Sequence, residues 1–135
     1  MDSGMIVAFY NPADQYHQSA VDFFTSCNSQ LITTVGCVTE SVFLLSRSWQ
    51  MQNRFLNHLA RRVYAIEPLT PDDFLRIAEL NEQYADLPGD FADLSLVAIS
   101  ERLNIAEIAT LDKDFDIYRR YRTKPFNRIF YPSLQ

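Results

Sequence analysis

Apolar residues along this chain follow two alternating patterns: short continuous runs, and longer stretches in which they recur at helical spacing. The short runs, which favour β-strands, lie at 31–34, 63–66, 107–110 and 128–131. The helical spacing covers residues 16–27, 38–49, roughly 51–62, and two segments that follow positions 70 and 90. Strands that alternate with helices in this way are typical of an α/β fold with a mainly parallel sheet.

Two of the predicted helices carry clear start signals. In the first, Thr70 is followed by Pro71 and two aspartates, a combination that is favoured at a helix N-terminus. In the second, the sequence Leu-Pro-Gly at 87–89 breaks the chain, and Asp90 then stands as a cap before a helix that reaches Leu103.

The N-terminal segment is ambiguous. Residues 5–10 form an apolar run that would pass as a buried strand on its pattern alone. Only Met1 precedes Asp2, so no apolar strand stands ahead of that aspartate. We expect either that the first strand of the fold is cut short or that the coding sequence starts further upstream.

Length and composition predict one globular domain over residues 1–135. Of the 135 residues, 47% are hydrophobic and 21% are charged, which is ordinary for such a domain. The apolar run at 5–10 is far too short to cross a bilayer, and the N-terminus lacks a signal-peptide pattern, so we expect a cytoplasmic protein without a membrane segment. Cys27 and Cys37 form no CxxC pair, which fits a reducing compartment.

The net charge of −5 at pH 7 argues against a protein that binds nucleic acid through charge alone. The positive charge is concentrated, however, because five of the twelve basic residues lie within one segment, at Arg119, Arg120, Arg122, Lys124 and Arg128. Two interpretations are open: these side chains hold an RNA backbone, or they are a solvated face and tail. An acidic centre that binds cations would also make the sequence look more acidic than the working protein.

The candidate chemistry lies in a few acidic residues. Ligands of parallel α/β sheets bind at the carboxyl ends of the strands; Asp112 follows a predicted strand, and Asp90 and Asp93 open a helix after a break. Glu40 is the only charged residue in the segment 31–46. An ionised carboxylate in an apolar site costs several kcal/mol unless it is paired or binds a metal. Alternatively, Glu40 lies in the first turn of its helix and is open to water.

The other acids have structural alternatives as well. Asp2 could be a frayed terminal residue, Asp90 and Asp93 could be helix caps, and the acids at 112–116 could form a solvated turn. Taken singly, none of these residues requires a function. Their joint order along the chain favours one.

Four motifs contain these acids. They are Asp2-Ser3-Gly4, Thr34-x-x-x-Val38-x-Glu40, Asp93-Leu-Ser-Leu-Val-Ala98 and Thr110-Leu-Asp112-Lys-Asp114-Phe115. In this order and spacing they resemble the motifs of the PIN-domain family, and the closest subgroup is the VapC-type toxin nucleases. The last motif is the sharpest match, and the resemblance spans almost the whole chain.

The resemblance implies a three-layer α/β fold, in which helices flank a twisted, mainly parallel sheet. It also implies a ribonuclease whose cofactor is Mg²⁺ or Mn²⁺, the hard cations that carboxylate oxygens suit. The implied partners are an RNA substrate, a small antitoxin protein and a second copy of the chain in a homodimer. The residues that match the family's catalytic, metal-binding acids are Asp2, Glu40, Asp93 and Asp112. Asp114 matches an assisting metal position, and Ser3 and Thr110 match hydroxyl residues beside the site.

Two departures from the family pattern bear on the site. PIN domains have an apolar strand near the middle of the sheet immediately before the first acid, whereas here only Met1 precedes Asp2. Loss of a central strand would expose unpaired backbone and leave Asp2 poorly held. In addition, Leu94 follows the third acid where a small alanine is usual, and we expect it to alter the packing there.

Two other functions remain open at this stage. The first is a non-catalytic module of the same fold that binds RNA or protein and has a degraded metal site, so it would lack a tight Mn²⁺ site. The second is a phosphatase with an aspartate nucleophile. Such enzymes usually carry D-x-D after the first strand, and this chain has Asp2-Ser-Gly instead; a covalent phospho-enzyme would favour them.

Overall fold

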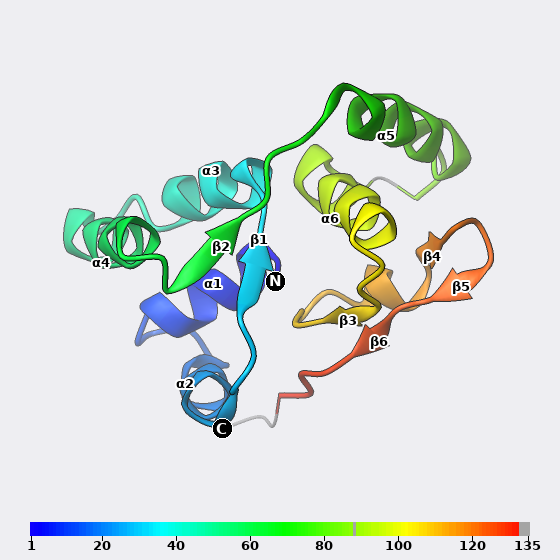
Figure 1. Ribbon diagram of the computed structural model, residues 1–135. Coiled ribbons are helices and arrows are strands. Elements are labelled where there is room, and N and C mark those ends of the chain that lie inside the picture. Colours follow the sequence, from blue (N-terminus) through cyan, green and yellow to red (C-terminus); the bar gives the residue numbers. More distant parts are fainter. Residues whose placement is uncertain (88, 133–135) are drawn as a thin grey trace.

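Helices and short strands alternate along the computed structural model, which describes residues 1–87 and 89–132 (Figure 1). The helices are α1 (Ser3–Tyr10), α2 (His17–Ser26), α3 (Val35–Leu44), α4 (Trp49–Ala60), α5 (Pro71–Gln83), α6 (Phe91–Arg102) and the 3₁₀ turn η1 (Lys113–Asp116). The strands are β1 (Leu31–Thr33), β2 (Tyr64–Ile66), β3 (Glu107–Ile108), β4 (Arg119–Arg120), β5 (Lys124–Pro125) and β6 (Asn127–Arg128).

The strands form pairs. β1 runs parallel to β2, with Leu31 opposite Tyr64, and β3 runs parallel to β6, with Glu107 opposite Asn127. A small antiparallel pair joins β4 and β5. The predicted α/β fold with parallel strands and flanking helices is confirmed. Within the described residues, however, the parallel strands form two separate pairs rather than one continuous sheet.

Met1 lies between the two parallel pairs. Its amino group donates to the carbonyl of Ile32 over 3.0 Å, and the amide of Asp2 donates to the carbonyl of Ala109 over 3.4 Å. Figure 1 accordingly shows the N-terminus beside β1, on the side that faces β3 and β6. The first acid therefore begins α1 from a point that is bonded to both halves of the fold.

The apolar run at 5–10 is a helix, not the strand that its pattern would allow. Asp2 caps α1, because its carboxylate accepts a hydrogen bond from the amide of Met5 over 3.1 Å. Most of α1 is buried, and α2 and α3 pack against it. A helix buried on most of its sides shows no amphipathic spacing, so periodicity could not separate it from a strand. The aspartate before the run was the available signal.

The predicted helix at 38–49 was wrong in its bounds. α3 begins at Val35, after the cap Thr34, and ends at Leu44, whereas Trp49 begins α4. Ser48 caps α4 by accepting a hydrogen bond from the amide of Met51 over 3.3 Å. Apolar residues recur at helical spacing across the turn between the two helices, so the pattern did not indicate where α3 ends and α4 begins.

The later elements follow their sequence signals closely. Thr70 and Asp73 form a reciprocal capping box at the start of α5, and Asp90 caps α6 by accepting from the amide of Asp93 over 2.8 Å. Pro88, part of the predicted break, lies outside the described residues. The predicted last strand at 128–131 is reduced to β6, which ends at Arg128.

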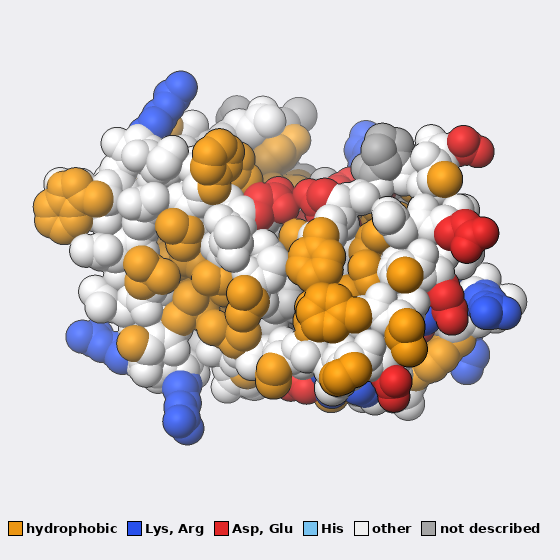
Figure 2. Space-filling view, turned by 90° about the horizontal axis from the view of Figure 1, so that it is seen from above, with side chains coloured by type: hydrophobic (Ala, Val, Ile, Leu, Met, Phe, Trp, Pro, Cys, Tyr) orange, Lys and Arg blue, Asp and Glu red, His pale blue; other side chains and the backbone are white. Residues whose placement is uncertain are grey.

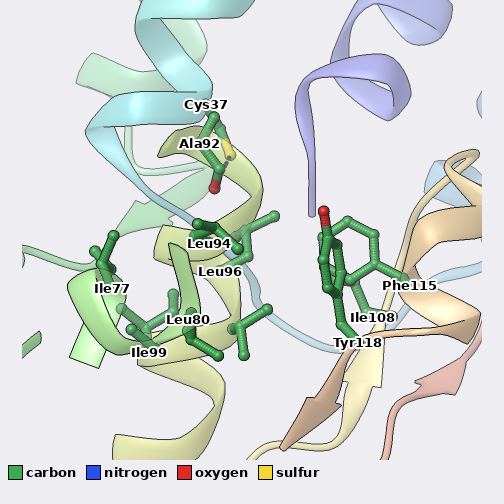
Figure 3. Close-up of a cluster of buried hydrophobic side chains, with 12 residues drawn as sticks. Cys37, Ile77, Leu80, Ala92, Leu94, Leu96, Ile99, Ile108, Phe115 and Tyr118 are labelled. Atoms are coloured by element: carbon green, nitrogen blue, oxygen red, sulfur yellow. Dashed lines mark hydrogen bonds between the residues drawn. The ribbon is translucent and has the colours of Figure 1, made fainter. Parts of the chain in front are cut away.

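α6 is the central helix of one hydrophobic core. Every residue from Leu94 to Ser100 is buried, and α3, α5 and β4 pack around the helix. Figure 3 shows leucines and isoleucines of α5 and α6 on one side of this core, with Phe115 and Tyr118 on the other. Leu94, the departure from the family pattern, is part of that core. Among the described residues, no helix combines the length and apolar character that a membrane crossing requires.

Candidate metal centre

Asp2 is the most enclosed of the candidate acids, with only 3% of its surface exposed. One carboxylate oxygen accepts from the amide of Met5, and the other accepts a short hydrogen bond from the hydroxyl of Thr110. The residue therefore has two tasks, because it caps α1 and is bonded to the segment that follows β3. A frayed terminus is excluded.

Glu40 reaches the same region from α3. Its Oε1 accepts a hydrogen bond of 2.9 Å from the hydroxyl of Ser3, the residue after Asp2. Because α3 begins at Val35, Glu40 lies in the second turn rather than in the first, as one interpretation of the sequence had it. The side chain is half-buried. A favourable position in the first turn therefore does not account for this carboxylate.

Asp90 and Asp93 lie at the N-terminus of α6. Asp90 is exposed and caps the helix, while Asp93 is half-buried in its first turn. Burial and, after it, the negative charges of four neighbours together raise the pKa of Asp93 to about 8. The four neighbours, in decreasing order of effect, are Asp90, Asp112, Asp2 and Glu40. The Asp93 carboxyl is therefore near enough to all four acids to be affected by their charges.

Asp112 and Asp114 complete the group from the segment after β3. The amide of Asp112 donates to the Thr110 hydroxyl over 2.9 Å, and Asp112 in turn accepts from the amide of Asp114 over 2.8 Å. These bonds fold the chain into η1 immediately after Asp112. The acids at 112–116 are therefore not merely a solvated turn, since Thr110 ties them to Asp2.

The negative charges disfavour one another. Burial, together with the charges of Asp90 and Asp2, raises the pKa of Glu40. Burial also raises the pKa of Asp2, although the hydrogen bond from Thr110 opposes this change. Asp114 follows the same direction, because burial and the charge of Asp112 raise its pKa. Figure 2 shows acidic side chains next to one another between apolar ones on this face. Such a group is stabilised when a cation lies close to it.

The donor atoms of this group fit a hard cation. All of them are carboxylate oxygens, the ligands that Mg²⁺ and Mn²⁺ prefer. Cys37, a buried thiol in α3, instead hydrogen-bonds to the carbonyl of Ala92. Within residues 1–87 and 89–132, no three acids, histidines or cysteines stand close enough together to hold an ion as placed. Most of these carboxylates instead accept hydrogen bonds from hydroxyl and amide groups. Repulsion between the carboxylates favours this arrangement over one in which their oxygens point at one another.

Two of the five clustered basic residues are used inside the fold. Arg120 is 4% exposed and donates to the carbonyl of Ser100 over 3.0 Å. Arg128 donates to Asp116 over 3.0 Å and to the carbonyl of Thr110 over 3.2 Å. For Arg120 and Arg128, the interpretation as solvent-exposed side chains of a helix face and tail is therefore wrong. Arg119 is half-buried, and Arg122 and Lys124 are the two that are exposed.

Tyr118 is a residue beside the site that the sequence did not reveal. Its side chain is fully buried, and its hydroxyl lacks a hydrogen-bond partner among the described residues. Burial and the charges of nearby aspartates, led by Asp93 and Asp114, raise its pKa. Figure 3 shows the hydroxyl at the upper end of the Tyr118 side chain, across the cluster from Leu94 and Leu96. No local sequence signal marks this position, because Asp93, the acid with the largest effect on it, comes from a distant segment.

Gly89 is fitted to this tyrosine. A Cβ atom at Gly89 would overlap the Tyr118 hydroxyl and lie 3.2 Å from the ring carbon that carries it. We expect Gly89→Ala to destabilise the protein by about 1–3 kcal/mol, because the buried ring cannot move away. In a Tyr118→Phe background the same change should cost clearly less, which urea unfolding of the four variants would measure. Equal costs in both backgrounds would contradict this fit.

The chain is similar to known proteins both at the level of family and at the level of fold. Residues 1–121 match the family model described as the PIN domain. The structure is similar to VapC20 of Mycobacterium tuberculosis, described as a Sarcin-Ricin loop cleaving toxin, with a TM-score of 0.81 and 20% sequence identity. The match covers 92% of this chain and 97% of that one. No protein with a curated description matches the sequence.

Proposed function

Because this chain belongs to the PIN domain family, we propose that it is a metal-dependent endoribonuclease that hydrolyses phosphodiester bonds in RNA. One observation carries the proposal: Asp93 lies among Asp2, Glu40, Asp90 and Asp112, which come from four separate parts of the chain. Apart from the helix cap Asp90, these are the acids that match the family's metal-binding positions. Carboxylates gathered in this way repel one another and destabilise the fold unless a cation balances their charge. Such a group is therefore typical of a functional site.

The proposed roles follow the placement of the side chains. Asp2, Glu40 and Asp93 would hold a first Mg²⁺ or Mn²⁺ ion, and Asp112 would complete that site or help to hold a second ion. Asp114 would assist from η1. A bound cation of this kind lowers the pKa of a water molecule and stabilises charge on the scissile phosphate.

The remaining task of the protein is to hold these carboxylates in position. The amide of Met5 and the hydroxyl of Thr110 orient the two oxygens of Asp2, and the hydroxyl of Ser3 orients one oxygen of Glu40. The amide of Asp93 is bonded to Asp90, which leaves the Asp93 carboxylate as the group at the start of α6 that is available to a cation. The positive end of the α6 dipole would favour its ionised form.

Exposed basic residues would hold the RNA backbone. Arg122 and Lys124 remain at the surface, and such contacts position a substrate without reading its sequence. Arg120 and Arg128 are already bonded inside the fold, so we assign them no phosphate contact. The substrate would therefore be positioned by few charges, in keeping with the net charge of −5.

A groove beside the acids supports the prediction of a protein partner. It has a volume of about 730 Å³ and is lined by Phe43, Phe74 and Phe91, together with Glu40 and Asp90. Phe43 is 74% exposed, and the rings of Phe74 and Phe91 stack at 6.2 Å between centroids. Exposed apolar surface of this kind marks interaction sites. We propose that a small antitoxin covers this groove and blocks access to the acids.

The structural neighbour supports this role, because it is described as a toxin. We accordingly propose that this chain is the toxin of a toxin–antitoxin pair and acts in the cytoplasm, where its free cysteines Cys27 and Cys37 would stay reduced. Homodimerisation also stays a prediction, which sedimentation of the purified chain would test.

The proposed activity has a direct test. We expect the purified chain to cleave an end-labelled RNA with unpaired loops when Mg²⁺ or Mn²⁺ is present, and to stop when a chelator is added. Calorimetry should show Mn²⁺ binding to the metal-free protein. A chain that binds RNA but neither binds Mn²⁺ nor cleaves would instead be the non-catalytic module. A covalent phospho-enzyme would identify the aspartate-based phosphatase.

A further inference from the structure

The hydroxyl of Tyr118 is the exception among the buried tyrosines. The hydroxyls of Tyr10 and Tyr64 are hydrogen-bonded to each other over 2.8 Å, and that of Tyr10 also lies 2.6 Å from Nδ1 of His58. The Tyr118 side chain is buried to the same extent, yet its hydroxyl bonds to no other described residue. A buried hydroxyl without a partner is unfavourable, whereas a phenylalanine ring would keep the same packing. Packing alone therefore does not account for this hydroxyl.

The ring of Tyr118 is held in place on several sides. The rings of Tyr84 and Phe115 meet it edge to face, with centroids 5.1 Å and 5.2 Å away. The backbone of Gly89 lies so close to the hydroxyl that a Cβ atom there would overlap it. The amide of Tyr118 donates to the carbonyl of Asp114 over 2.9 Å. The fold thus sets the position of the hydroxyl, and any partner has to approach it there.

This position is at the start of α6. Gly89 directly precedes the cap Asp90, and the site of its missing Cβ atom is also 3.3 Å from Leu94, the residue after Asp93. Burial, and after it the charge of Asp93 more than that of any other residue, raises the pKa of Tyr118. The hydroxyl therefore keeps its proton and is a neutral donor beside a carboxylate.

The Asp93 carboxylate is the matching acceptor. The Asp90 carboxylate already accepts from the amide of Asp93, and that of Asp112 accepts from the amide of Asp114. The Asp93 carboxylate accepts no hydrogen bond from any residue that the structure describes, and Asp114 affects Tyr118 less than Asp93 does. A donor without an acceptor and an acceptor without a donor thus lie at the same end of α6.

The other acids assigned to the first cation already have hydroxyl donors. Ser3 donates to Glu40 over 2.9 Å, and Thr110 donates to Asp2. Side chains that bind a metal generally depend on such outer hydrogen bonds to keep one orientation. Asp93 is the member of this group that lacks one.

We propose that Tyr118 is a positioning residue of the metal centre, whose hydroxyl donates a hydrogen bond to the Asp93 carboxylate when a cation is bound. The inference rests on the proposed function, which assigns Asp93 to that cation. Because the ring is fixed by its packing, the hydroxyl would restrict Asp93 to one orientation. The tyrosine would not touch the substrate, since its side chain is fully buried.

The test compares the parent chain with Tyr118→Phe and Tyr84→Phe. Tyr84 is a matched control from the same aromatic cluster, because its hydroxyl has a partner, the amide of Arg119 at 2.9 Å. In calorimetry, Tyr118→Phe should weaken Mn²⁺ binding by about tenfold to a hundredfold. The melting temperature of its metal-free form should stay level or rise. Tyr84→Phe should do the opposite, with a lower metal-free melting temperature and unchanged Mn²⁺ affinity.

Two further measurements separate positioning from a structural role. With ¹³C at the tyrosine Cζ atoms, the signal that is missing in Tyr118→Phe identifies Tyr118, and saturating Mg²⁺ should shift this signal in the parent more than that of any other tyrosine. In cleavage assays, a higher Mn²⁺ concentration should restore most of the rate of Tyr118→Phe, because the variant keeps all of the acids that hold the cation.

Other results would overturn the proposal. If the parent binds Mn²⁺ and cleaves RNA, and Tyr118→Phe binds Mn²⁺ as tightly, Tyr118 has no part in the centre although the proposed function stands. If the parent binds no Mn²⁺, the metal centre fails and this inference fails with it. If Tyr118→Phe lowers the metal-free melting temperature as much as Tyr84→Phe does, the hydroxyl is a structural group of the core.

Discussion

Replacement of Asp93 by Asn will abolish Mg²⁺- or Mn²⁺-dependent RNA cleavage, with a loss of at least about 100-fold, and will also stabilise the metal-free protein at pH 8. The loss of activity follows because Asp93 is proposed to hold the cation on which the chemistry depends. The gain in stability follows because the pKa of Asp93 lies at about 8, so its charge is unfavourable in the folded protein. Initial cleavage rates and melting temperatures measure the two effects.

The pH dependence of stability gives the same prediction a second measurement. The carboxyl of Asp93 has a pKa near 3.8 when unfolded and about 8 when folded, so the folded state binds the proton more tightly. The contribution of this group is therefore fully present below about pH 4 and is lost as the pH rises toward 8. Asp93→Asn should remove this part of the decline. Added Mg²⁺ should counter it in the parent protein by binding the ionised form.

The matched control is Glu82→Gln, which also removes one carboxylate. Glu82 is exposed on α5 and should change neither cleavage nor the slope of stability against pH. Full cleavage by the Asp93→Asn variant would end the proposed mechanism. If that variant melts lower than the parent at pH 8 without metal, Asp93 is a structural residue rather than a strained one.

The positions of Asp90, Asp93 and Asp112 at the ends of elements could be predicted from the sequence, because each follows a strong local signal. Asp112 follows an apolar run that becomes β3, and Asp90 and Asp93 follow a chain break and begin α6. Such signals depend on short-range geometry, which a sequence contains directly. The α/β fold followed from the same alternation of elements. The roles of the individual acids at a metal remain predictions, since they depend on a bound ion.

What the sequence could not predict depends on contacts between distant segments. The bond from Ser3 to Glu40 joins α1 to α3, and the burial of Arg120 against Ser100 removes a residue that looked available to RNA. The buried helix α1 lacked the amphipathic spacing that identifies surface helices. In each case the deciding partner lies far away along the chain, so tertiary packing overrides the local pattern.

Replacement of Thr110 by Val should destabilise the protein by about 2–4 kcal/mol, because valine keeps the shape but loses one buried and one partly buried hydrogen bond. The Thr110 hydroxyl donates to the carboxylate of Asp2 and accepts from the amide of Asp112. The carboxylate of Asp2 would be left without this donor at a buried position. For a domain of this size the melting temperature should fall by on the order of 10 °C.

Thr110→Ser is the control, since it removes only a methyl group and keeps both hydrogen bonds. It should recover most of the melting temperature and most of the Mn²⁺ affinity, whereas the valine variant should bind Mn²⁺ more weakly because Asp2 is no longer oriented. The loss should also deepen with rising pH, because the Thr110 hydroxyl lowers the pKa of Asp2 and its absence disfavours the charged form. If the valine variant instead melts with the parent while the serine variant melts lower, packing of the methyl group rather than the hydroxyl links β3 to α1, and Asp2 is held by its helix alone.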